Sequence, residues 1–103
     1  MSKLFILSTV FVFLFSNCKK NNTSASYTPS CSGTQSYSIN VAPLIQNYCV
    51  SCHSNYASFN QVKLSSASIR NSIVSGSMPR GALLTTDQKN SIVCWIDAGA
   101  LNN

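Results

Sequence analysis

Cys49-Val50-Ser51-Cys52-His53 is the part of this 103-residue sequence with the most specific chemistry. Two thiols three positions apart on a tight helical turn can each reach one vinyl group at the edge of a haem and form a thioether bond. The next residue, His53, then lies below the ring, where its imidazole can bind the iron. The motif predicts one covalently bound haem c, held by Cys49 and Cys52, with His53 as the proximal ligand.

The same spacing occurs in haem-free proteins, and an exported CxxC module without haem is the alternative. In that alternative Cys49 and Cys52 form a disulfide with each other, or bind zinc together with His53. A zinc site needs a fourth ligand, and His53 is the single histidine of the sequence. A thioredoxin-like protein needs strands that alternate with helices, and the sequence has no such pattern.

The residues before the motif have the spacing of a helix with one apolar face. Apolar side chains recur at intervals of three, four and seven positions, at Val41, Leu44, Ile45 and Tyr48. Asn40 is placed to cap the start of this helix. Pro43 then falls in the first turn, where its missing N–H costs no hydrogen bond. The motif therefore follows directly from an amphipathic helix.

A second, weaker helix is expected over residues 65–75. Ile69 and Ile73 lie one turn apart in it, and Gly76 is placed to end it. A loop containing Met78 and Pro79 follows.

The last helix has the clearest signals. Thr85 and Gln88 form a capping box, and Asp87 lies in the first turn, where the helix dipole favours a negative charge. One face carries the apolar residues Ile92, Trp95 and Ile96, and Gly99 is a natural C-cap. No hairpin signal or alternating run occurs. The expected fold class is all-α, a small domain of about three helices around one haem.

With this motif, these helices and a Met-Pro loop, the sequence resembles the mono-haem class I cytochrome c family. It is more similar still to the short cytochrome c-like lipoproteins of bacteria, over about residues 37–103. The resemblance implies that Met78 is the distal iron ligand. It also implies that the first and last helices cross near the haem edge, with Tyr48 and Trp95 as candidates for that contact; a plain core role is the alternative for both residues. Only 25 positions separate His53 from Met78. This is short for the family and implies a more exposed haem.

Met78 is also a candidate ligand from its own sequence context. It is the only methionine besides Met1, and Pro79 restricts its backbone to an extended conformation. A loop of this kind can present a thioether to the open face of the iron. The alternative is a methionine that fills a gap in the core. Arg80 is placed to pair with a haem propionate, since guanidinium groups suit carboxylates, or else is simply solvated.

The N-terminus has the pattern of an export signal. After Lys3, the run Leu4–Phe15 is almost entirely apolar, and it is too short to span a bilayer. Cys18 and a polar stretch follow. This order resembles a bacterial lipoprotein signal, which implies a signal peptide at 1–17 and a lipid on Cys18. Phe15-Ser16-Asn17 departs from the usual lipobox, so ordinary cleavage is the alternative.

Both forms of processing predict an exported protein, and lipidation anchors it on the periplasmic or cell-surface side of a bacterial membrane. Residues 18–36 are rich in Ser, Thr and Asn and are expected to form a tether. Residues 37–103 are then the cytochrome c-like domain. The net charge is +5, but the basic residues are scattered, so nucleic acid is not an expected partner.

The five cysteines leave one further pair. Lipid takes Cys18 and haem takes two, which leaves Cys31 and Cys94. An even remainder in an oxidising compartment favours a disulfide, with free thiols or intermolecular pairing as alternatives. On the last helix Cys94 lies about 200° from Ile92, opposite the apolar face. The bond would therefore hold the preceding segment across the back of that helix.

The expected function is electron transfer. An iron with both axial positions filled has no site for a substrate, so we expect a one-electron carrier between a donor and an acceptor protein rather than an enzyme. If Met78 does not bind, the open axial site would favour small-ligand binding or peroxidase-like chemistry. Binding of carbon monoxide to the reduced protein separates the two.

Overall fold

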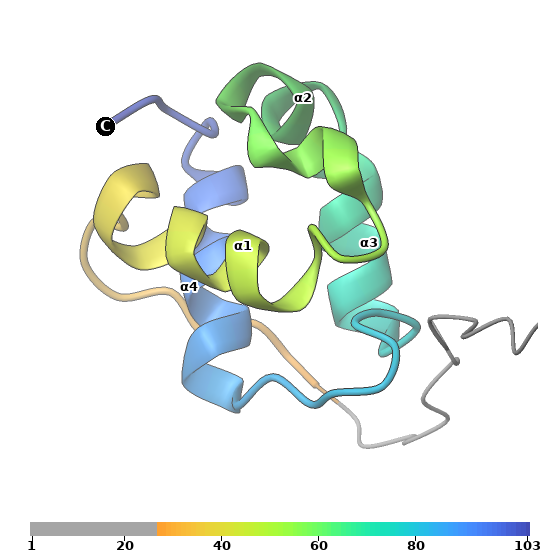
Figure 1. Cartoon of the computed structure of the whole chain (residues 1–103). Coiled ribbons are helices and arrows are strands. Elements are labelled where there is room, and N and C mark those ends of the chain that lie inside the picture. The colour runs from red at the N-terminus through yellow and green to blue at the C-terminus, as the bar shows by residue number, and fades with distance from the viewer. Residues whose placement is uncertain (1–26) are drawn as a thin grey trace, which may run out of the picture.

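Helices are the only regular secondary structure in the computed structural model, which describes residues 27–103 (Figure 1). The elements are a π-helical turn η1 (Tyr37–Val41), α1 (Ala42–Tyr48), a 3-10 turn η2 (Ser54–Ala57), α2 (Phe59–Leu64), α3 (Ser66–Ser75) and α4 (Thr86–Asp97). The all-α prediction is confirmed for this part of the chain. The sequence predicted about three helices, and the short helix α2 is the one it did not predict.

The first helical segment begins earlier than expected. Ser36 is its N-cap, and the Ser36 hydroxyl accepts a hydrogen bond from the N–H of Ile39. The prediction of Asn40 as the N-cap was therefore wrong. The Asn40 side chain instead accepts a hydrogen bond from the N–H of Ser36 at 2.8 Å, inside the helical turn. Pro43 lies in the first turn of α1, as predicted.

The last two helices begin and end close to the predicted positions. Thr85 and Gln88 form the capping box of α4, with both hydrogen bonds present. Gly76 ends α3 in the left-handed conformation, with φ of 79°. At the end of α4 the C-cap is Ala98, and Gly99 follows it with φ of 111°, one residue beyond the predicted position.

The core gathers around α4. In this helix four consecutive residues, Ile92 to Trp95, are buried. The segment η1–α1, α2, α3 and the loop before α4 contribute the other large apolar residues, namely Val41, Ile45, Val62, Ile69, Ile73 and Leu84. η1 and α3 both pack against α4 (Figure 1). η1, α3 and a covering segment, which is the chain before η1, all pack on α4. This helix is therefore buried on more than the single face that the sequence predicted.

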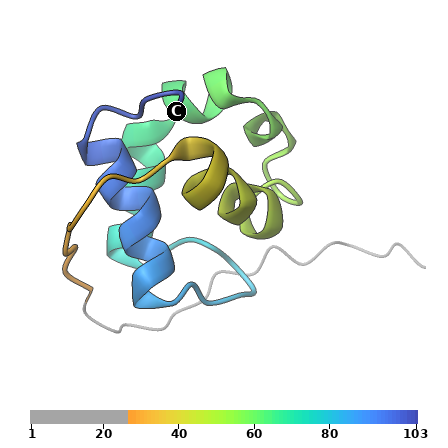
Figure 2. The same ribbon diagram turned by 90° about the vertical axis from the view of Figure 1, so that its left-hand side faces the viewer.

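The covering segment is the chain before η1, which runs along α4 (Figure 2). Cys31 and Cys94, 63 positions apart in the sequence, form a disulfide, the pair that the sequence favoured. The Tyr27 hydroxyl donates to Oδ1 of Asn90 at 2.6 Å, and the N–H of Ser30 donates to the same oxygen. Residues 27–36, which were predicted to be tether, therefore pack on the helical domain. They also leave Cys94 only 7% exposed, although it lies opposite Ile92.

α3 and α4 are also joined by an ion pair. Nε of Arg70 donates to Oδ1 of Asp97 at 2.6 Å, and a second guanidinium nitrogen donates to Oδ2 at 3.1 Å. This two-point geometry fixes the relative position of the two side chains better than a single contact does. The pair is partly exposed, so it contributes little to stability on its own.

Among the helices of residues 27–103, none has both the length and the apolar character needed to cross a membrane. The predicted signal peptide at 1–17 and the predicted lipidation site at Cys18 lie outside the described residues.

Candidate functional site

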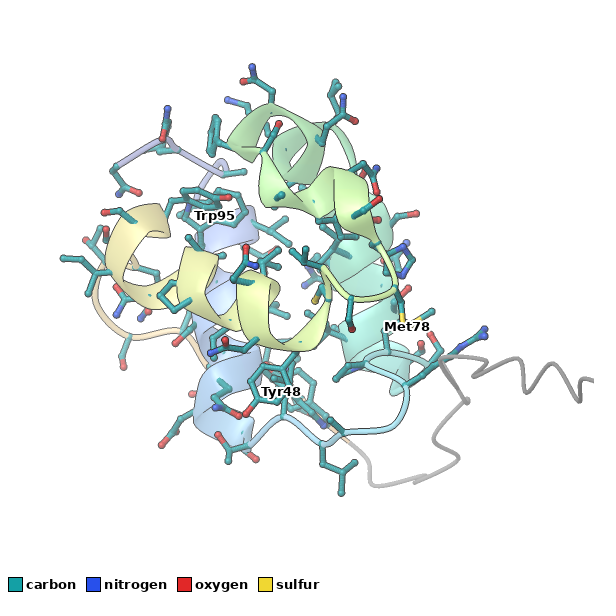
Figure 3. All side chains as sticks on the ribbon, in the orientation of Figure 1. Tyr48, Met78 and Trp95 are labelled. Carbon is teal, nitrogen blue, oxygen red and sulfur yellow. A yellow bond between two sulfur atoms is a disulfide. The ribbon has the colours of Figure 1, made fainter. Side chains whose placement is uncertain are left out.

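One pocket brings together the residues of the CxxCH motif and the Met-Pro loop. It has a volume of about 290 Å³ and is lined by Tyr48, Cys49, Cys52, His53, Met78, Pro79 and Arg80. The first four residues come from the end of α1 and the turn after it, and the last three come from the loop between α3 and α4. Figure 3 shows Tyr48 and Met78 on these two parts of the chain. Residues 25 positions apart in sequence thus share one site.

The backbone after α1 explains how the motif is gathered. The N–H groups of Cys49 and Val50 both donate to the carbonyl of Ile45, which ends the helix. The chain then closes a tight turn, in which the N–H of Cys52 and that of His53 both donate to the carbonyl of Cys49. This turn returns the backbone of His53 to the side of Cys49.

The His53 ring packs against an aromatic neighbour. The rings of His53 and Tyr56 are stacked, with centroids 4.8 Å apart and planes only 16° apart. Aromatic pairs in this range add about 0.5–1.5 kcal/mol beyond the area they bury. Tyr56 was not singled out from the sequence. The available signal was the aromatic residue three positions after the histidine, because side chains three positions apart lie side by side in a 3-10 turn.

The loop that carries Met78 is held at both ends. At its start, the N–H of Met78 donates to the carbonyl of Ser72 in α3 at 3.2 Å. At its end, Leu84 is buried in the core, and Pro79 between them is also buried. Met78 itself is half-buried and lines the pocket rather than joining the core cluster. The core-filler alternative for Met78 therefore does not describe this structure.

The two cysteines of the motif differ in their surroundings. Cys49 is a free thiol, and burial raises its pKa to about 11. A redox-active CxxC motif depends on a lowered thiol pKa, so this environment disfavours a thioredoxin-like role. Cys52 is exposed. Since Cys49 is a free thiol, the two cysteines are not bonded to each other.

Tyr48 and Trp95 were expected near the same haem edge, but only Tyr48 lines the pocket. Trp95 is buried elsewhere, with its ring centroid 5.2 Å from that of Tyr37 and 6.2 Å from that of Phe59 (Figure 3). Its Nε1 donates to the carbonyl of Leu101 at 2.8 Å. Trp95 is thus a core residue that joins α4 to η1, to α2 and to the segment that follows α4.

The donor atoms of this pocket do not form a ready-made site for a bare metal ion. Within the part of the chain that the structure describes, no three His, Cys, Asp or Glu side chains are grouped closely enough to hold one. The Cys31–Cys94 disulfide is not part of the pocket lining.

Comparison with known proteins adds no relative. None of the protein-family models matches the chain, and no curated protein and no solved structure is similar to it at a significant level.

Proposed function

We propose that this protein is a mono-haem c-type cytochrome that transfers single electrons. The observation that carries the proposal is the shared pocket of Cys49, Cys52, His53 and Met78. Any one of these residues has a simpler explanation. Their convergence on one cavity, from two separate parts of the chain, would provide two attachment points and two iron ligands for a haem c.

The donor set fits this group. Two cysteine sulfurs, one imidazole and one thioether are the side chains that hold haem c with His/Met ligation. When bound, the haem supplies an iron that alternates between two oxidation states. Cys49 and Cys52 would fix its edge, and His53 and Met78 would fix its two faces.

The remaining residues of the pocket would pack against the haem or bind its carboxylates. Tyr48 and Pro79 bring apolar surface to the lining, against which the haem ring would pack. Arg80 lies in the same lining, where its guanidinium can hold a carboxylate of the haem. If His53 and Met78 both bound the iron, they would leave it no free position for a substrate, which favours an electron carrier over an enzyme.

We further propose that the protein is exported and anchored to a bacterial membrane through a lipid on Cys18. The packed part of the chain extends back at least to Tyr27, which forms a hydrogen bond to α4. At most nine residues then span the distance from Cys18, and fully extended they reach about 30 Å. Such a short tether holds the domain near the membrane, where electron donor and acceptor proteins of the same membrane are present at raised effective concentration.

A visible spectrum tests this function. The protein should be produced with c-type haem maturation and recorded oxidised, then reduced, with and without carbon monoxide. We expect a sharp reduced α-band of the c-type, a weak sulfur-to-iron band in the oxidised form and no response to carbon monoxide. A carbon monoxide shift would instead indicate a labile Met78 bond and a ligand-binding protein. A colourless protein from a host with working maturation would contradict the haem assignment and leave the CxxC module.

A further inference from the structure

We infer that Tyr56 is a positioning residue for His53, one whose ring holds the imidazole in the orientation needed for axial ligation. The inference rests on the proposed haem function, because it concerns the residue assigned there as the proximal ligand. It adds a role for a residue that is not itself among the described residues lining the pocket.

Two contacts join Tyr56 to His53. Their rings are nearly parallel, with planes 16° apart and centroids 4.8 Å apart. The N–H of Tyr56 also donates to the carbonyl of His53 at 2.9 Å, in the turn that leads into η2. The backbone bond fixes the spacing of the two residues, and the stack fixes the plane of the imidazole relative to the phenol.

Tyr56 is itself held by the rest of the fold. It is half-buried and packs against the core cluster. A surface tyrosine would rotate with the imidazole and fix nothing, whereas a ring anchored in the core is a fixed support. His53 lines the pocket and Tyr56 does not, so the support takes up none of the space that a bound group needs.

This arrangement fills a general requirement of metal-binding histidines. Their rings are usually oriented by a hydrogen bond from the second ring nitrogen, and loss of that outer partner weakens metal binding or activity. A ring stack can restrict the imidazole in the same sense, although it does so by packing. Here the stack with Tyr56 supplies a contact of that kind. An imidazole without it can rotate about its side-chain bonds, which changes the plane that it presents to the iron.

Electron paramagnetic resonance of the ferric protein tests the inference, because the g-values of low-spin haem respond to the plane of an axial imidazole. Tyr56→Phe keeps the stacked ring and is expected to retain the wild-type g-values. Tyr56→Leu removes the ring and is expected to shift and broaden the low-spin signal. Phe59→Leu is the matched control. It removes another half-buried aromatic ring, whose partners are Tyr37 and Trp95, and should leave the g-values unchanged.

Unchanged g-values in matured Tyr56→Leu would overturn the positioning role and leave the haem function intact. If Tyr56→Leu does not fold or mature, nuclear Overhauser effects between the ring protons of Tyr56 and His53 in the wild-type protein test the stack instead. Their presence supports the stack, and their absence overturns it. A wild-type protein that takes up no haem would overturn the function and the positioning role together.

Discussion

His53 and Met78 line the same pocket, although 25 positions separate them in the sequence. The turn after α1 places His53, and the hydrogen bond from the N–H of Met78 to the carbonyl of Ser72 places Met78. Since α3 lies between them in sequence, the relationship depends on how α3 packs against α4. The proposed haem ligation would in this sense depend on the fold as well as on the motif.

Removal of the Met78 thioether should open the site. Met78→Ala is expected to abolish the sulfur-to-iron band, to allow carbon monoxide to bind the reduced protein and to lower the reduction potential, since methionine ligation raises it. Leu83→Ala is the matched control, because Leu83 lies in the same loop, is 63% exposed and does not line the pocket. A Met78→Ala protein with the wild-type oxidised spectrum would show that the thioether is not a ligand.

Loss of the Cys31–Cys94 disulfide should reduce stability without affecting haem attachment. The bond closes a loop of 63 residues, for which about 2–4 kcal/mol of stabilisation is typical. Cys31→Ser and Cys94→Ser are both expected to lower the melting temperature while the reduced α-band per protein stays the same. An unchanged melting temperature in both variants would contradict the role assigned to the bond.

The Arg70–Asp97 pair should give stability a dependence on acid pH. Its hydrogen bonds to Arg70 hold the pKa of Asp97 below its ordinary value of 3.8. The unfolded chain therefore takes up a proton at this site more readily than the folded one. The contribution is complete above about pH 4 and is lost as the pH falls through the lower folded pKa.

Asp97→Asn tests this dependence in melting curves between pH 2 and pH 6, pH values chosen to bracket the ordinary value. The variant is expected to lose less stability than the wild type over the acid part of the range. Asp87→Asn is the control, because Asp87 is exposed in the first turn of α4 and has no part in the pair. Parallel wild-type and Asp97→Asn curves would contradict the assignment.

Cys49 should behave as an unreactive thiol in protein produced without haem. Burial raises its pKa to about 11, so little thiolate is present at neutral pH. Alkylation of Cys49, followed by mass spectrometry of its peptide, is expected to be slow at pH 7 and to accelerate towards pH 11. Rapid alkylation at pH 7 would point to an activated thiol and favour the redox CxxC alternative.

The sequence predicted the elements that depend on local signals. The capping box of Thr85 and Gln88 begins α4, and the left-handed Gly76 ends α3, because each needs only neighbours within one turn. The pocket residues were also found from the sequence, since motif spacing constrains the two cysteines and the histidine together.

Features set by distant contacts were missed. Nothing near Ser36 identifies it as the first cap, since its place also depends on Asn103, whose carbonyl accepts a hydrogen bond from the Ser36 hydroxyl. The burial of Cys94 depends on residues more than 60 positions earlier in the chain. Helical spacing places Trp95 on the apolar face with Ile92 and Ile96, and only its packing on Tyr37 and Phe59 assigns it to the core rather than to the pocket.

Intact-protein mass spectrometry decides whether Cys49 and Cys52 hold a haem covalently. The wild type and a Cys49→Ala/Cys52→Ala variant should be matured side by side and denatured before measurement. We expect the wild type to carry the added mass of one haem and the double variant to carry none. A wild-type protein with the bare polypeptide mass, from a host that matures a reference cytochrome, would contradict covalent attachment.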